Sequence, residues 1–151
     1  MSKGGTKNRI QVNMKPLEEL SKVFNDLGNG NGIDEAIERA FIKAHKWITD
    51  NARNAMQPHN RTGKTVSTLV PARVEKGHHS LDIDVGFDIA NGGLPSIFLM
   101  YGTAKHEPNH PATPPDKRLY NVFYGKGVKA KITRMEKAEV QEAINRRLKQ
   151  W

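Results

Sequence analysis

The chain has 151 residues, no cysteine, and 24 Lys and Arg against 16 Asp and Glu, which gives a formal net charge of +8. This length suits a single domain that buries close to ~70% of the surface exposed by its unfolded chain. The lack of cysteine excludes disulfide bonds, thiolate metal sites and a cysteine nucleophile. No apolar run approaches the ~20 residues of a membrane-spanning helix, and the basic N-terminus lacks the apolar core of a secretion signal. We therefore expect a soluble, unexported protein with no membrane partner.

The charge balance favours a negatively charged partner, and nucleic acid first among these. The basic residues gather at the N-terminus, in the segment 126–137 and at the C-terminus. Aromatic residues are not interleaved with them along the sequence, as they are in surfaces on which bases stack. The composition thus predicts diffuse contact with a phosphate backbone and no sequence-specific reading of bases. The candidate DNA-facing residues are Lys126, Lys129, Lys131 and Arg134.

The first third of the chain predicts one strand and two helices. Residues 1–9 are polar and contain glycine, so we expect a mobile arm followed by a single α+β domain over 10–151. Ile10 to Met14 alternates as a half-buried strand does, and Pro16 opens a helix that ends at Gly28. The clearest element is an amphipathic helix from Asp34 to Met56. Its apolar stripe consists of Ile33, Ile37, Ala40, Phe41, Ala44, Ile48, Ala52 and Ala55.

Three strands are expected after this helix. Thr65 to Glu75 has β-branched residues at alternate positions, and Leu81 to Phe87 alternates strictly between apolar and other residues. Lys76-Gly77 suits the turn of a hairpin between them. The apolar run from Ile97 to Tyr101 predicts a buried third strand. This order indicates an α+β fold in which a small antiparallel meander is packed by the long central helix, with further helices towards both termini.

A Pro-rich segment follows the third predicted strand and leads into a helix. Its prolines hold an extended loop at low entropy cost. Asp116 stands before Leu119 and Phe123 as an N-cap stands before an apolar helix face, and this helix runs to Tyr124. We predict that the loop forms a rigid clamp at a subunit or partner interface. The prolines are Pro108, Pro111, Pro114 and Pro115.

The last segment, Val128 to Trp151, is rich in helix-forming residues. Its apolar residues fall into two sets that lie about a third of a turn apart by the ~3.6-residue period. A straight helix would not bury both sets against one flat surface. Either the helix bends, or its second half packs on another chain.

One motif suggests metal chemistry. His106-Glu107-Pro108-Asn109-His110 matches the H-E-x-x-H pattern of zinc peptidases. That chemistry requires a helix that places both imidazoles on one face, with the Glu beside the metal-bound water. Pro108 within the motif and Pro111 after it argue against a helix. We expect a polar loop with no resident metal, no cofactor and no catalytic residues.

Two segments resemble a family of virion proteins. The turn after the long helix, RTGKTVSTL from Arg61 to Leu69, resembles the family's T-G-x-L-x-x-S motif. Phe98 to Thr103, FLMYGT, followed by His110-Pro111 and a helix, resembles its Y-x-x-x-x-E-Y-G-T…P signature. The family comprises head–tail joining or tail-completion proteins of long-tailed phages and prophages, kin to the lambda Z protein. Met100 stands in place of the acidic residue, and Lys64-Thr65 replaces the common Arg/Leu, which suggests a subfamily.

The resemblance implies a structural virion protein without catalysis, made in the host cytoplasm. It would form a ring at the neck or at the top of the tail, expected to be hexameric, with DNA passing through the lumen. Neighbours would be head-completion, tail-terminator or tail-tube proteins. A ring needs a heterologous interface, so we expect exposed apolar residues in one protomer, with Trp47, Met100, Tyr101 and Trp151 as candidates. The signature and interface residues are Thr62, Gly63, Tyr101, Gly102, Thr103, His110, Pro111, Pro114, Pro115, Asp116, Trp47 and Trp151.

Two other functions stand as alternatives. The first is a stand-alone nucleic-acid-binding module, which the net charge and the basic C-terminal helix favour. The second is a metal-dependent hydrolase built on His106, Glu107 and His110, which the motif alone favours.

Overall fold

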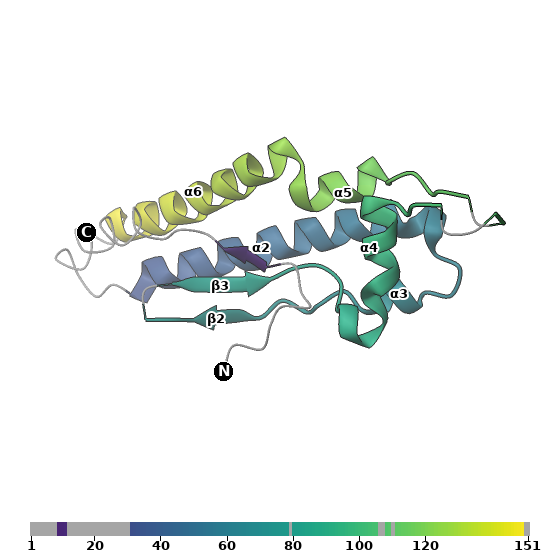
Figure 1. The fold of residues 1–151 in the computed structure, drawn as a ribbon. Helices are drawn as coiled ribbons and strands as arrows, with labels where there is room; N and C mark the ends of the chain where they lie inside the picture. The colour runs from purple at the N-terminus through teal and green to yellow at the C-terminus, as the bar shows by residue number, and fades with distance from the viewer. Residues whose placement is uncertain (1–8, 12–30, 79, 106–107, 110, 150–151) are drawn as a thin grey trace.

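A computed structural model of the chain describes residues 9–11, 31–78, 80–105, 108–109 and 111–149. The fold is α+β, as predicted (Figure 1). Residues 1–8 of the predicted arm and the predicted helix from Pro16 to Gly28 lie outside the described residues, whereas the prediction is wrong for Arg9, which pairs with Asp84 in the sheet. The elements in chain order are β1 (Arg9–Gln11), α2 (Asn31–Met56), η1 (Gln57–His59), α3 (Lys64–Ser67), β2 (Val74–Lys76), β3 (Leu81–Asp84), η2 (Ile89–Gly93), α4 (Leu94–Tyr101), α5 (Lys117–Tyr124) and α6 (Lys126–Leu148).

Helix α2 is the central element of the fold. It lies between the sheet on one side and α6 on the other (Figure 1). Every residue of the predicted apolar stripe is buried, because the ~3.6-residue period places these side chains on the faces of α2 that meet its neighbours. The helix begins three residues earlier than predicted, at Asn31, and it ends at Met56 as predicted. The long central helix is therefore confirmed.

The sheet has three strands in the order β1-β3-β2, all antiparallel. The predicted hairpin between β2 and β3 is confirmed, and the amide of Gly77 donates to the carbonyl of Ser80 at 2.8 Å within its turn. Ile83 stands opposite Val74 on one side and opposite Ile10 on the other. The third strand therefore comes from the N-terminal region. Ile10 and Gln11 confirm the first part of the predicted N-terminal strand, and residues 12–14 lie outside the described chain.

The predicted strand from Ile97 to Tyr101 is wrong, because these residues form the second half of α4. An apolar run without alternation does not distinguish a buried strand from a buried helix. Local chemistry favours the helix. Pro95 occupies the first turn, where no amide donor is needed, and the Ser96 hydroxyl donates to the carbonyl of Gly93 at 2.7 Å.

The predicted strand from Thr65 to Glu75 is also largely wrong. Only its end belongs to β2, and its beginning forms the short helix α3. The hydroxyls of Ser67 and Thr68 each donate to a backbone carbonyl three residues earlier, both at 2.7 Å, which closes a helical turn. Such local hydrogen bonds compete with a sheet ladder, and β-branched composition does not reveal them.

The last helix, α6, is continuous from Lys126 to Leu148 and packs along α2 (Figure 1). Val128 and Ile132 join a core cluster with the C-terminal half of α2, α5 and Met100. Val140 joins a second cluster with Phe41 of α2 and the strand residues Leu81 and Ile83. Val128, Ile132 and Val140 are therefore buried within one chain, whereas Met135 and Ile144 are half-buried. The idea that the second half packs on another chain is wrong for Val140, which belongs to a core cluster of its own chain.

Candidate interaction surfaces

Asp116 lies where the Pro-rich segment meets α5. It is the N-cap of this helix, as predicted. Its Oδ1 accepts hydrogen bonds from the amides of Arg118 at 2.8 Å and Leu119 at 3.1 Å, at the start of α5. Its Oδ2 lies 2.7 Å from Nε2 of His59 in η1. Its own amide donates to the carbonyl of Leu99 in α4 at 2.7 Å. One residue thus ties η1, α4 and α5 together.

The hydrogen bonds of Asp116 determine its charge state. Burial by itself raises the pKa of this carboxyl group. The hydrogen bonds from His59, Leu119 and Arg118 together outweigh burial, so that the pKa lies below its ordinary value. The carboxylate is therefore ionised at neutral pH, which suits its position at a helix N-terminus.

Gly102 allows the Pro-rich segment to fold back onto the end of α4. Its φ of 74° and ψ of 176° lie in a region that only glycine populates readily. A Cβ atom at this position would lie 2.5 Å from the carbonyl oxygen of Thr113. Just beyond it, the amides and carbonyls of Thr103 and Thr113 exchange two hydrogen bonds, at 2.9 and 3.1 Å. This bridge closes the base of the loop, while the predicted position of the loop at a subunit or partner interface stays a prediction.

The Thr62-Gly63 turn lies at the same end of α2. Gly63 has a φ of 75° and precedes α3, which lies beside α4 in Figure 1. Thr62 is exposed, and its hydroxyl accepts from the amide of Lys64 at 3.4 Å. Pro111, Pro114 and Pro115 are exposed. The described signature residues therefore gather at one end of the molecule, whereas His110 lies outside the described residues.

An exposed surface, here called the aromatic patch, is built by α4 and α5. Leu94, Phe98 and Tyr101 of α4 lie one or two helical turns apart, so they share a face of the helix. The ring centroids of Tyr101 and Tyr120 are 5.8 Å apart, and those of Tyr120 and Tyr124 are 5.1 Å apart. Partial burial raises the pKa of Tyr124, and the neighbouring Tyr101 adds to this effect. The patch consists of Leu94, Phe98, Tyr101, Tyr120 and Tyr124, which are between 36% and 56% exposed.

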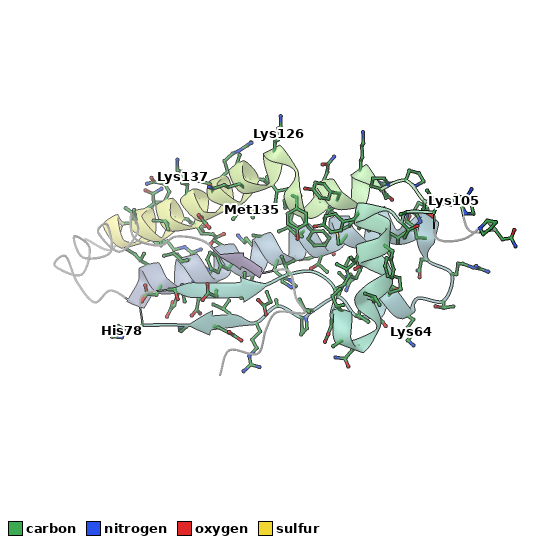
Figure 2. The ribbon with its side chains drawn as sticks, viewed as in Figure 1. Lys64, His78, Lys105, Lys126, Met135 and Lys137 are labelled. Carbon is green, nitrogen blue, oxygen red and sulfur yellow. The ribbon has the colours of Figure 1, made fainter. Side chains whose placement is uncertain are left out.

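Exposed basic residues around the first half of α6 make up the second surface, here called the basic face; they are not confined to one side of the helix, because Lys129 and Lys131 are two residues apart. Lys126 and Lys137 project from the side of α6 that points away from the sheet (Figure 2). Within residues 126–138 the one acidic residue is Glu136, which is buried. Among the described residues, no ion pair involves these basic side chains. The basic face consists of Lys126, Lys129, Lys131, Arg134 and Lys137, all exposed.

The predicted interface candidates differ in how exposed they are in the structure. Tyr101 is 56% exposed, as expected. Met100 is buried in the core beside Leu119, so its prediction as an exposed residue is wrong. The cause is the helix, since a one-residue step along α4 turns the side chain by ~100°. Trp47 is half-buried against the first core cluster, and Trp151 lies outside the described residues.

Two carboxylates of α6 face inward, with opposite environments. Glu139 is 5% exposed and binds Lys43 and Arg39 of α2, with Arg39 Nε 3.4 Å from Oε2. Lys43 and then Arg39 hold its pKa below the ordinary value. Glu136 is 7% exposed, and its Oε1 has no hydrogen-bond partner among the described residues. Burial raises the pKa of Glu136.

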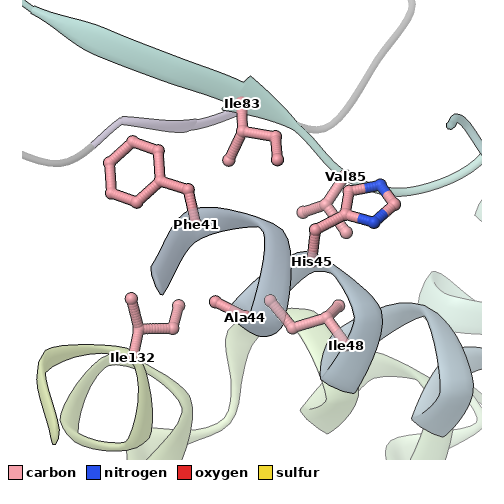
Figure 3. A pocket seen from close by; sticks show the side chains of 7 residues that line it. All are labelled: Phe41, Ala44, His45, Ile48, Ile83, Val85 and Ile132. Carbon is pink, nitrogen blue, oxygen red and sulfur yellow. The ribbon is translucent and has the colours of Figure 1, made fainter. Parts of the chain in front are cut away.

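A small cavity lies between α2, β3 and α6 (Figure 3). Its volume is about 10 Å³, which is the size of about one water molecule. His45 forms part of its wall, and Nε2 of His45 lies 3.0 Å from the carbonyl oxygen of Val70. The carbonyl can only accept, so Nε2 carries the proton. The cavity is a packing gap, too small for a ligand. Its other lining residues are Phe41, Ala44, Ile48, Ile83, Val85 and Ile132.

Metal binding receives no support from the part of the chain that the structure describes. No group of three or more His, Asp or Glu residues there is arranged to hold an ion. His106, Glu107 and His110 lie outside the described residues, whereas Pro108 and Asn109 form a turn. No helix among the described residues is long and apolar enough to cross a membrane.

Several residues of these surfaces were missed by the sequence analysis. Leu94, Phe98 and Tyr101 are separated by four and three residues, which is helical spacing. Because a strand was predicted here, their common face was not recognised. Tyr120 and Tyr124 are four residues apart and each follows a buried residue, Leu119 or Phe123, by one position, so the sequence already indicated that the two tyrosines share a neighbouring face. The contact of His59 with Asp116, 57 residues away, has no sequence signal.

Comparisons with known proteins identify no relative of this chain. The chain matches no protein-family model, and neither curated proteins nor solved structures give a match.

Proposed function

We propose that this protein is a structural component of a long-tailed phage or prophage virion, without catalytic activity. It assembles as a ring at the head–tail connector or the top of the tail, and DNA passes through the lumen. The observation that carries this proposal is that one protomer holds two distinct exposed surfaces, the aromatic patch and the basic face. A ring subunit needs one kind of surface for its neighbours and another for the DNA.

The arrangement of the signature residues supports the same proposal. Gly63, Gly102 and Asp116 come from three separate segments and lie at one end of α2. Two of them have positive φ, and the third joins three elements. Residues that resemble a family signature thus hold the α4–α5 corner in place, and this corner carries the aromatic patch.

The basic face supports contact with DNA that does not depend on sequence. Residues 117–151 contain ten Lys and Arg against three Asp and Glu, a net charge of +7 out of the +8 of the whole chain. Exposed Lys and Arg side chains neutralise phosphates and release counterions, but carry no base specificity by themselves. Such contact would let DNA slide through a lumen.

The proposal is tested on particles. A phage whose genome encodes this chain is purified, its proteins are identified by mass spectrometry, and the protein is located by electron microscopy with a bound antibody. We expect several copies per particle at the neck or the top of the tail. In a strain that lacks the gene we expect heads and tails that fail to form stable joined particles. Infectious full particles without this protein would contradict the proposal.

A stand-alone nucleic-acid-binding module is the second candidate, and the concentration of charge in α5 and α6 favours it. The two functions differ in the particle and in the state of the purified protein. A monomer that binds duplex DNA tightly and is absent from particles would support the module and exclude the virion role.

A further inference from the structure

The aromatic patch is the main exposed apolar surface of the described chain. Six large apolar or aromatic side chains are exposed among the described residues, and five of them form the patch. The sixth, Ile42, stands alone on α2. A contiguous patch of this kind typically marks a protein interface, whereas single exposed apolar residues are ordinary.

The surroundings of the patch indicate the charge of its partner. Lys117 and Arg118 lie in the first turn of α5, and Lys126 follows Tyr124 by two residues. All three are exposed, and none forms an ion pair with another described residue. A partner that covers the patch is therefore expected to bring negative charge to its basic rim.

Negative charge of this kind lies at the opposite end of the same chain. Asp34 and Glu35 are exposed in the first turns of α2, and neither forms an ion pair with another described residue. Lys76, the nearby cation, is bound to Glu38 instead. The patch lies beside the other end of α2, whose 26 residues span about 39 Å. The two surfaces are therefore too far apart to meet within one protomer.

We propose that the aromatic patch of one protomer binds the acidic start of α2, at Asp34 and Glu35, in a second copy of this chain. The contact is head-to-tail, so each protomer exposes one patch and one acidic end to further copies until a ring closes. This inference rests on the proposed function in that it names the surfaces by which the ring would assemble.

The test measures self-association of the full chain by sedimentation velocity across a range of concentrations. The wild-type protein is expected to associate reversibly. Phe98→Asp is expected to raise the dissociation constant at least tenfold, because the new carboxylate removes an aromatic ring from the contact and repels Asp34 and Glu35 of the partner. Ile42→Asp is the matched control, since Ile42 is 48% exposed and Phe98 is 49% exposed, and it is expected to change the constant less than twofold. Circular dichroism shows that each variant is folded.

The polarity of the contact is tested by combining variants. Glu35→Lys and Lys117→Glu are each expected to weaken association at least threefold, and the double variant is expected to recover part of that loss. A mixture of Phe98→Asp with Glu35→Lys is expected to form a dimer, because each supplies the surface that the other lacks. A patch that binds another patch would instead leave Glu35→Lys fully associated, and this result would overturn the head-to-tail contact.

Failure of this inference is distinguishable from failure of the proposed function. A wild-type chain that stays monomeric at every concentration, or a Phe98→Asp variant that associates normally, overturns the patch as the self-contact. Either result leaves the location of the protein in particles to be decided by mass spectrometry and microscopy. Loss of DNA affinity in Phe98→Asp with unchanged self-association would assign the patch to nucleic acid and also overturn the inference.

Discussion

Gly102 shows how one backbone conformation controls the α4–α5 corner. Its φ of 74° and ψ of 176° disfavour any side chain, and a Cβ would collide with the backbone of Thr113 and Pro115. We predict that Gly102→Ala lowers the free energy of unfolding by about 3 kcal/mol, the upper end of the range for such strain. Urea denaturation measures this change.

Gly127 provides the matched control. It lies in the first turn of α6, and a Cβ there would meet nothing within 4 Å. Alanine in a helix is favoured over glycine by ~1 kcal/mol, so Gly127→Ala is expected to leave the protein as stable or slightly more stable. Equal destabilisation by both substitutions would contradict the assignment of strain to Gly102.

His45 predicts a pH dependence of stability. Burial lowers the pKa of this imidazole, Arg53 adds a small effect in the same direction, and the hydrogen bond to Val70 opposes both. An unfolded His titrates near ~6.5. Below that pH the unfolded chain therefore binds more protons at this residue than the folded chain, and the free energy of unfolding falls as the pH falls.

His45→Gln isolates this effect from the other histidines. The glutamine amide can still donate to the Val70 carbonyl, but it does not titrate. We expect the free energy of unfolding of the wild type, minus that of the variant, to decrease as the pH is lowered from 7.5 to 5.5 in urea titrations. A constant difference over this range would show that His45 does not titrate in this window.

At the level of elements, α2 and α6 are joined by an ion pair as well as by apolar packing. Glu139 is buried and bound to both Arg39 and Lys43, whose side chains are more exposed. We predict that Glu139→Gln lowers the free energy of unfolding at pH 7 by ~1 kcal/mol. Glu142→Gln removes the exposed pair with Arg146 and is expected to cost less than ~0.5 kcal/mol.

The lowered pKa of Glu139 gives this prediction a second measurement. The carboxylate stabilises the fold above the pKa of the unfolded chain, near ~4.3, and this stabilisation is lost as the pH falls through the lower pKa of the folded chain. The two proteins are therefore expected to converge in stability in acid. A difference that persists at pH 2 would mean that packing, and not charge, is lost in the variant.

The elements also show how far sequence predicts this fold. Residues of α2 and β3 follow one period, so the apolar stripe could be predicted from the pattern alone, whereas the buried Ala36, His45 and Thr49 of α2 lie outside the predicted stripe. In α4, the run from Ile97 to Tyr101 has no period, and a serine hydroxyl and a proline decide its conformation. Short-range hydrogen bonds, rather than composition, also formed α3. Pattern predicts well where packing on one face dominates.

For the whole molecule, the sequence predicted the basic residues of α6 but not their relation to the tyrosines. No aromatic residue is interleaved with them along the chain, and yet α5 places Tyr124 two residues before Lys126 and brings Tyr101 beside Tyr120. The aromatic patch forms only in the folded chain, because Tyr101 and Tyr120 are 19 residues apart in the sequence. The spacing places Tyr124 near Lys126, but the addition of Tyr101 to this surface could not be predicted from it.

The basic face predicts how the affinity for DNA depends on salt concentration. If Lys129, Lys131 and Arg134 contact phosphates, replacing all three with Gln removes up to three counterion-releasing contacts. The slope of log K against log salt concentration should then become shallower by about 2 to 3, because each phosphate contact contributes ~0.9. Fluorescence anisotropy with a labelled duplex of mixed sequence measures both affinity and slope.

The control for this measurement replaces Lys46, Arg53 and Arg73 with Gln, which changes the net charge equally but outside α6. A general field effect would weaken binding similarly in both triple variants, because long-range attraction depends on total charge. A local contact surface would change the slope in the α6 variant alone. Binding should also be insensitive to the duplex sequence, since phosphate contacts carry no base information. A strong preference for one sequence would exclude a passive lumen surface and favour the stand-alone nucleic-acid-binding module.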